Sequence, residues 1–226
     1  MGGLGFSLNP QLIQFLPRLV VLLICISVHE FAHGYVAYKL GDNTAANMGR
    51  LTLNPIKHFD LFGSLALLFI GFGWAKPVPV NPRAFRNPRR DFALVAAAGP
   101  LSNIIMAIIV MSILRVILGL ISPQTYFHSA TFNQFYGLLF AIIHLNLVLA
   151  VFNMLPVPPL DGSRILYAFL PDRLYFGVMR YERIIMIALI ALLFMGYLTN
   201  IILAGTNQLL RFVIFITQPI SMILGG

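Results

Sequence analysis

Long apolar runs separated by short polar stretches dominate this sequence of 226 residues. A helix needs about 20 residues to cross a bilayer. Four runs reach that length: residues 16–40, 92–114 (or to 121), 132–155 and 184–203. A fifth run, 209–224, is shorter and contains Arg211 and Pro219, so it fits a spanning helix and an interfacial helix equally well. The pattern predicts an all-α polytopic membrane protein with four to six transmembrane helices.

One more apolar run, residues 61–75, is short for a spanning helix and is interrupted by glycines. Such a run suits a re-entrant segment, or one that lies on the membrane surface. The next stretch, KPVPVNPR at 76–83, alternates Pro and Val, and proline within a sheet is confined to its edges. We therefore expect a short re-entrant or β-strand element on the cytoplasmic side, or in its place a stiff loop on the lipid headgroups.

The composition excludes an ordinary soluble domain. Hydrophobic residues make up 59% of the chain and charged residues only 10%, whereas soluble domains have about a quarter of their residues charged. The net charge of +8 does not indicate nucleic-acid binding, because the arginines lie between apolar runs. We therefore expect the lipid bilayer, and no nucleic acid, among the partners.

The distribution of Lys and Arg predicts the orientation, because cytoplasmic loops of membrane proteins are enriched in both. Residues 39–90 contain eight of these cations, residues 120–133 contain none, and residues 156–183 contain four. We therefore expect the amino terminus outside and the two basic segments in the cytoplasm. We expect the protein to lie in the cytoplasmic (inner) membrane.

The first long run contains His29-Glu30-Phe31-Ala32-His33, an H-E-x-x-H motif. On a helix, residues i and i+4 share a face, so both imidazoles can bind one zinc ion. Glu30 lies beside the open coordination position, where it can take a proton from bound water. Incidental polar packing is the alternative, but ionisable groups are costly in lipid and mark function by default.

Asp161 is the best candidate for a third ligand, since zinc hydrolases usually keep three protein ligands. It follows the third long run, in a turn that contains three prolines within residues 156–159. Prolines hold the chain extended and suit a rigid ligand-bearing loop. The charge distribution puts Asp161 at the same membrane face as the H-E-x-x-H motif. The alternative is a loop aspartate that caps the helix after it.

Two asparagines of the third long run are further candidates. Asn153, eight residues before Asp161, can donate a hydrogen bond to the oxyanion that develops during amide hydrolysis. Asn146 lies seven residues earlier, two helical turns away on the same face. Packing between helices is the alternative for both, because buried amides often bridge transmembrane helices.

The other two spans contribute one amide and one thiol. Asn103 follows Pro100 in the second long run, where it can compensate the helix defect or orient a zinc ligand. Cys25 lies four residues before His29, on the same helical face. It is either a further metal ligand or a buried inert thiol.

With these residues in place, the chain resembles the site-2 protease family, the M50 intramembrane zinc metalloproteases, in its short type without PDZ or CBS domains. Four blocks carry the resemblance: HEFAH, GRLTLNPIKHFD, KPVPVNPRAFRNPRRD followed by AAAGPLSN, and NMLPVPPLDGSRIL. They cover most of residues 25–170 in the family's order. The resemblance implies one zinc ion per chain, held by His29, His33 and Asp161. It also implies Glu30 as general base and Asn153 as a group that helps to stabilise the oxyanion.

The resemblance further implies a three-helix catalytic core on the first three long runs, with short strands near the active site. We expect one membrane-embedded metalloprotease domain over residues 1–226, with its core at about 11–170 and accessory helices at about 181–224. The expected activity is intramembrane endoproteolysis of a transmembrane protein substrate, with the active site toward the cytoplasmic face. The alternatives are a metal-ion transporter that uses the His/Asp site and a homologue that binds membrane proteins without cleaving them. No oligomeric state follows from the sequence.

Overall fold

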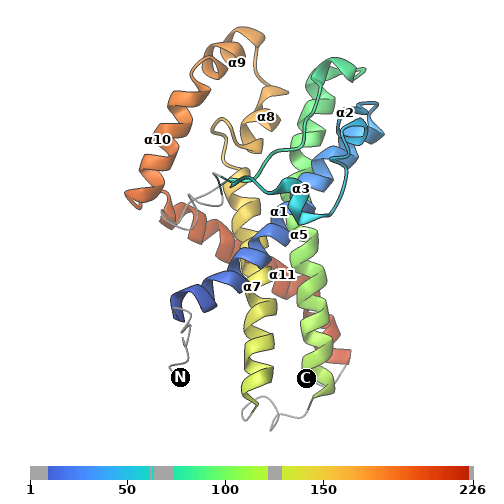
Figure 1. Cartoon of the computed structure of the whole chain (residues 1–226), viewed down its shortest axis with the longest axis vertical. Helices are drawn as coiled ribbons and strands as arrows, with labels where there is room; N and C mark the ends of the chain where they lie inside the picture. Colours follow the sequence, from blue (N-terminus) through green and yellow to red (C-terminus); the bar gives the residue numbers. More distant parts are fainter. Residues whose placement is uncertain (1–9, 62, 64–73, 122–128, 224–226) are drawn as a thin grey trace, which may run out of the picture.

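Four long helices dominate the structure, a computed structural model that describes residues 10–61, 63, 74–121 and 129–223 (Figure 1). Each is long and apolar enough to cross a membrane, so the chain is an integral membrane protein. They are α1 (Pro10–Lys39), α5 (Pro88–Leu120), α7 (Ala130–Asn153) and α11 (Thr199–Ile223). The prediction of an all-helical membrane protein is confirmed for the described residues.

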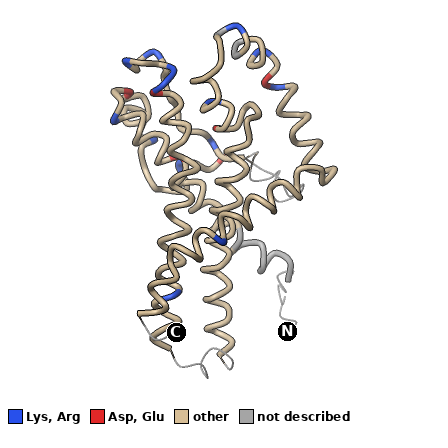
Figure 2. Tube along the Cα trace, turned by 180° about the vertical axis from the view of Figure 1, so that it is seen from behind, with Lys and Arg blue, Asp and Glu red and all other residues tan. Residues whose placement is uncertain are grey.

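The described short elements are α2 (Thr44–Asn47), α3 (Pro55–His58), the 3-10 helix η1 (Pro82–Ala84), α8 (Asp161–Tyr167), α9 (Asp172–Met179) and α10 (Glu182–Phe194). Most of them gather toward one end of this bundle (Figure 1). Figure 2 shows that most Lys and Arg residues lie at this same end. We call it the basic end; most described elements of the basic segments 39–90 and 156–183 lie there.

The second long helix, α5, holds the bundle together, because it packs against α1, α7, α8 and α11. It begins at the basic end with Pro88 in its first turn, and the Asp91 carboxylate accepts a hydrogen bond from the Asn87 N–H at 3.1 Å. Proline in the first turn and an acidic residue there both favour a helix start. The largest buried apolar cluster joins α5 to α7 and α11: Ala107, Val110, Met111, Leu114, Ile143, Leu147 and Val213.

The predicted spanning helix at 184–203 is wrong. α10 has 13 residues and ends at Phe194, which is too short to cross a bilayer. Gly196 then adopts a φ of +79°, which side chains with a Cβ rarely adopt, and α11 starts at Thr199. The apolar run 184–203 is therefore broken near its middle. Its last residues join the 209–224 run in one helix, α11, which is the candidate spanning helix.

Contacts at both ends of α11 place it across the bundle. Near its start, a Cβ on Gly205 would lie 2.8 Å from the side chain of Val151, two residues before α7 ends at the basic end. Near its other end, Arg115 of α5 donates hydrogen bonds to Thr217 Oγ1 at 2.9 Å and Ser221 Oγ at 2.7 Å. Arg115 lies five residues before α5 ends, on the side away from the basic end. α11 therefore runs from the basic end of α7 toward the opposite end of α5, as a candidate spanning helix.

The expected edge strand at 76–83 is absent from the described residues, which contain no strand. Side chains hold this segment instead. The Arg50 guanidinium donates to the carbonyls of Lys76 at 2.8 Å and Pro77 at 3.1 Å. Prolines at 77 and 79 have no N–H to offer to a neighbouring strand, so the segment forms a stiff loop. Most of the expected re-entrant run at 61–75 lies outside the described residues.

The hydrogen bond from Arg115 to Thr217 predicts a specific stability effect. Thr217→Val leaves the Arg115 Nε–H without this acceptor inside the bundle. We expect the free energy of unfolding to fall by about 1–2 kcal/mol, the order of a polar contact between membrane helices. Thermal melting in detergent measures the change.

Thr206→Val is the matched control on the same helix. Thr206 and Thr217 are both buried, but the Thr206 hydroxyl has no hydrogen-bond partner among the described residues. Its replacement should leave stability unchanged or raise it. Equal effects of the two substitutions would contradict the role given to Arg115.

Candidate metal centre

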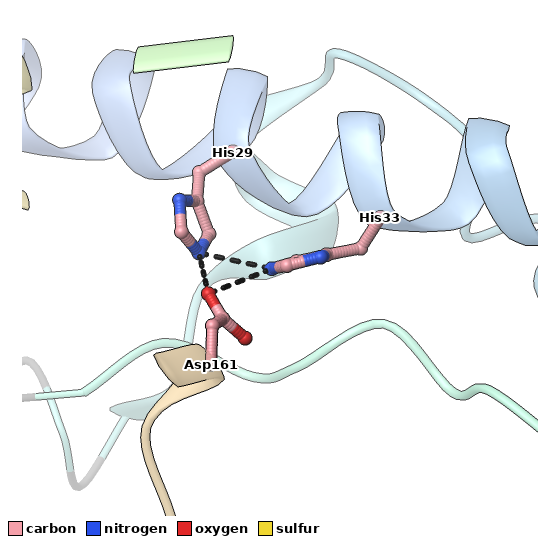
Figure 3. A group of neighbouring side chains, drawn as sticks. All are labelled: His29, His33 and Asp161. Atoms are coloured by element: carbon pink, nitrogen blue, oxygen red, sulfur yellow. Dashed lines mark hydrogen bonds and ion pairs between the residues drawn. The ribbon is translucent and has the colours of Figure 1, made fainter. Parts of the chain in front are cut away.

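Three side chains converge on one point between α1 and the start of α8 (Figure 3). The Nε2 atoms of His29 and His33 are 3.0 Å apart, and Asp161 Oδ2 lies 3.2 Å from the first and 3.3 Å from the second. Ligand atoms about 2.0–2.1 Å from a tetrahedral zinc ion are roughly 3.3 Å from one another. The three atoms thus have the spacing of one face of such a tetrahedron.

The far side of each imidazole is tied to α5. His33 Nδ1 donates to the carbonyl oxygen of Val95 at 2.7 Å, and His29 Nδ1 lies 2.9 Å from Asn103 Oδ1. A carbonyl oxygen can only accept, so the Nδ1 nitrogens hold the protons and the Nε2 nitrogens present lone pairs. Two lone pairs and a carboxylate oxygen within 3.3 Å of one another repel unless a cation lies among them. The chemistry of this donor set fits a divalent metal.

The Asp161 carboxylate has little else to bind. Its Oδ2 atom is buried and makes no hydrogen bond in the described structure. This oxygen is directed at the two histidines, the arrangement that a shared metal ion would need.

Asp161 does not act as a helix cap, the alternative that its position after a proline-rich turn left open. Leu160 occupies the N-cap position of α8, and its carbonyl accepts from the Ser163 N–H at 3.1 Å. Gly162 lets α8 begin here, because a Cβ at this residue would lie 2.3 Å from the Met154 carbonyl oxygen. The close approach of α8 to the end of α7 fixes Asp161 opposite α1.

Gly99 of α5 makes room for both histidines, a role that its sequence position did not reveal. A Cβ at this residue would lie 2.4 Å from His33 Nε2 and 2.6 Å from His29 Cε1. Real Cβ atoms do not approach other atoms so closely, so only glycine fits here. The signal in the sequence was a glycine inside a long apolar helix, which often marks close packing.

Glu30 lies beside the three ligands without belonging to them. Its Oε2 atom accepts a hydrogen bond from the Val78 N–H at 2.7 Å, so the loop at 76–80 contacts α1 at this point. Glu30 and the three ligands line one cavity of about 710 Å³, bounded by α1, α5, α7, α10 and residues 74–80. The motif glutamate is therefore at the same cavity as the three candidate metal ligands.

The two asparagines of α7 separate in the structure. Asn153 lines the cavity, and its side-chain NH₂ donates to the Leu149 carbonyl of its own helix at 3.0 Å. Asn146 is buried away from the cavity, where it donates to Cys25 Sγ at 3.2 Å and to the Ile142 carbonyl at 2.8 Å. Asn146 and Cys25 thus join α7 to α1, and neither belongs to the ligand group.

The sequence comparisons agree with this geometry. The family described as Peptidase family M50 matches residues 17–196, a range that holds all three candidate ligands and Glu30. The chain belongs to this family. It is therefore a zinc metalloprotease by family, and its four candidate transmembrane helices make it a membrane-embedded member.

Several curated proteins are similar to the chain. A Bacillus subtilis (strain 168) protein named "Putative zinc metalloprotease YwhC" is 48% identical over 160 residues, which are 70% of this chain and 72% of that protein. The Rip2 protein of Mycobacterium tuberculosis (strain H37Rv), named in the same terms, is 31% identical over 62% of this chain and 52% of its own length. Zinc metalloprotease MJ0392 of Methanocaldococcus jannaschii is 27% identical over 88% of this chain and 49% of its own length. No solved structure matches the chain.

The space at Gly99 yields a prediction about metal content. Gly99→Ala should push the imidazoles apart and lower bound zinc well below one ion per chain. Gly137→Ala is the matched control, because a Cβ at Gly137 meets nothing within 4 Å. Each alanine favours its helix by about 1 kcal/mol, so the fold should persist in both variants. Elemental analysis of the purified proteins measures zinc, and unchanged zinc in Gly99→Ala would contradict this packing.

The Asn103 contact yields a second prediction. Groups that hold the outer nitrogen of a ligating histidine typically contribute about 10–100-fold to metal affinity. We expect Asn103→Leu to weaken zinc affinity by about this factor in competition with a chromophoric chelator. Ser102→Ala is the control, since the Ser102 hydroxyl donates only to the Gly99 carbonyl of its own helix. If both variants bind zinc like the wild type, Asn103 serves packing alone.

Proposed function

We propose that this chain hydrolyses peptide bonds in or beside transmembrane segments of membrane protein substrates, with one zinc ion held by His29, His33 and Asp161. The observation that carries the proposal is the convergence of two imidazole lone pairs and a carboxylate beside Glu30. They line a cavity between membrane-spanning helices. Bound zinc supplies a Lewis acid and lowers the pKa of water at its open position toward neutrality.

Glu30 is the proposed general base. It takes the proton from the attacking water and returns it to the leaving amine. The Val78 N–H holds Oε2, which fixes the plane of the carboxylate and leaves Oε1 to accept the proton. Arg50 helps to hold Val78 in place, because its guanidinium donates hydrogen bonds to the carbonyls of Lys76 and Pro77 just before Val78. We assign Arg50 as a positioning residue.

Asn153 is the proposed oxyanion donor. One hydrogen of its NH₂ group is used by the Leu149 carbonyl, and an amide nitrogen carries two. The second hydrogen remains for the oxygen on which negative charge develops during hydrolysis. The helix bond also restrains the side chain, so the donor does not have to be ordered when the substrate arrives.

The residues that line the cavity favour a substrate segment with apolar side chains. Around the polar centre the cavity wall includes apolar side chains of the loop 74–80, of α5 and of α10: Val78, Val80, Phe92, Met186, Leu189 and Ile190. A substrate helix must unwind before cleavage, because its carbonyls are engaged in helix hydrogen bonds. When apolar side chains of such a segment leave the lipid, contacts with an apolar cavity wall offset the free-energy cost.

The basic end is the proposed cytoplasmic side, because cytoplasmic loops carry the excess of Lys and Arg. Asp161 opens α8, which lies toward that end, so the candidate metal centre lies toward it (Figure 1). Water can then reach the centre from the cytoplasm through the loops around residues 74–80. The cytoplasmic membrane is the proposed location of the protein.

Glu30→Gln tests the function. The amide keeps an oxygen for the Val78 N–H but cannot take a proton from water. We expect zinc to stay near one ion per chain and the cleavage rate to fall by about 10²–10⁴-fold. Mass spectrometry of membrane fractions should find a substrate that accumulates uncut, with the wild-type neo-terminus in or beside a transmembrane segment.

Glu182→Gln is the matched control, because Glu182 lines the same cavity but pairs with Arg164 at 3.7 Å. It should cleave at a rate close to that of the wild type. The wild type could instead transport zinc into proteoliposomes, with Glu30→Gln abolishing this flux, while the membrane-fraction peptides of the two proteins are the same. That result would contradict the protease function and indicate a metal transporter. Zinc well below one ion per wild-type chain would instead indicate a homologue that binds without cleaving.

A further inference from the structure

One face of α11 is polar where a membrane-spanning helix is usually apolar. The residues on it are spaced 7, 4 and 7 apart, so at 3.6 residues per turn they lie within about 40° of one another around the axis. All of them are exposed in the structure. We call these residues the polar stripe of α11: Asn200, Asn207, Arg211 and Gln218.

The polar stripe faces away from the rest of the described chain. A different side of α11, about 120° around the axis, packs against α5 and α7 and buries Thr206, Val213 and Thr217. Phe215, beside the stripe, is 72% exposed, as expected of a side chain in contact with lipid or with another helix. No residue of α11 lines the cavity at the metal centre. The stripe is thus a surface separate from the proposed active site.

The position of Arg211 makes exposure of this surface to lipid energetically unfavourable. Arg211 is twelve residues from either end of α11, about 18 Å along the helix axis. That distance exceeds the reach of an arginine side chain, so the guanidinium cannot extend to the interface as it does near helix ends. A cation at the middle of a spanning helix almost always faces a partner group or a water-filled cavity.

The chain itself provides no counter-charge for Arg211. Within the described residues no hydrogen bond or ion pair reaches it, and the undescribed residues contain no Asp or Glu. Six of the seven acidic side chains have other partners: Glu30, Asp42, Asp60, Asp91, Asp161 and Glu182. The seventh, Asp172, opens α9 at the basic end, away from the middle of α11.

A second copy of the chain does not supply the counter-charge either. Two copies in one membrane share their orientation, so a symmetric pair is related by an axis along the membrane normal. Such an interface brings the same patch of both subunits together. Arg211 would then face Arg211 at equal depth, and like charges repel strongly in a medium of low dielectric. The occupant must carry the opposite charge.

We propose that the polar stripe of α11 binds a transmembrane helix of another protein that carries a carboxylate at mid-membrane depth. The Arg211 guanidinium pairs with that carboxylate through two parallel hydrogen bonds, for which its planar fork is shaped. Asn207 and Gln218 bond the same helix one and two turns away on either side. This partner helix docks outside the cavity, so it acts as an assembly or regulatory subunit rather than as the segment to be cleaved.

Designed peptides test the proposal without knowledge of the natural partner. The probes are Leu/Ala helices of about 20 residues with a central Glu, Gln or Leu, long enough to span. Energy transfer between labelled peptide and the zinc-loaded full chain in phosphatidylcholine vesicles measures association. We expect the Glu peptide to associate about tenfold more tightly than the Leu peptide, the order of effect of a polar contact between membrane helices.

Three variants make the result specific to Arg211. Arg211→Leu should reduce the preference for the Glu peptide to less than about twofold. Arg211→Glu should instead prefer a peptide with a central Arg. Gln208→Leu, one exposed position beside the stripe, should behave as the wild type. Zinc content and melting temperature show that each variant is folded.

Three results would overturn the proposal. The first is equal association of the Glu and Leu peptides with the wild type. The second is loss of the Glu preference when anionic phosphatidylglycerol replaces part of the neutral lipid, which would identify a lipid headgroup as the occupant. The third is a dimer of the full chain, seen by single-molecule photobleaching, that Arg211→Leu dissociates.

Discussion

Two imidazoles and a carboxylate can lie inside a helix bundle only if every other polar atom of these groups is satisfied. α5 meets this requirement for the histidines, with the Val95 carbonyl for His33 and the Asn103 amide for His29. Gly99 on the same helix removes the side chain that would clash with both rings. The register between α1 and α5 therefore decides where the lone pairs point, and α8 has to bring Asp161 to that place.

A second set of contacts fixes the loop that closes the centre. Arg50 holds its first carbonyls, Glu30 accepts from the Val78 N–H, and Asp42 accepts from the Asn81 N–H at 2.7 Å. Three groups from α1 and the chain just after it thus anchor one segment of six residues. Two prolines stiffen what lies between. The orientation of Glu30 and the shape of the cavity wall depend on the same anchors.

The sequence by itself determined the class of protein and most of its chemistry. Uninterrupted apolar runs can only be satisfied in lipid, so α1, α5 and α7 follow from length and composition. The i, i+4 spacing places His29 and His33 on one face whatever surrounds them. Asp161 stood out because few acidic residues exist and charge put it at the same face. These inferences rest on composition, helix periodicity and charge placement, all of which can be read from the sequence without knowledge of tertiary contacts.

Only the tertiary structure decided what depends on neighbours distant in sequence. A glycine at 196 breaks one apolar run and lets α11 cross instead, because hydrophobicity does not report a positive φ. Asn103 and Asn146 are both buried amides, yet one meets a ligand histidine and the other a thiol. Arg50 looks in the sequence like an ordinary loop cation, but in the structure it is buried and holds the Lys76 carbonyl by a hydrogen bond. Each role is set by which atoms packing brings within hydrogen-bond distance, and no residue encodes that alone.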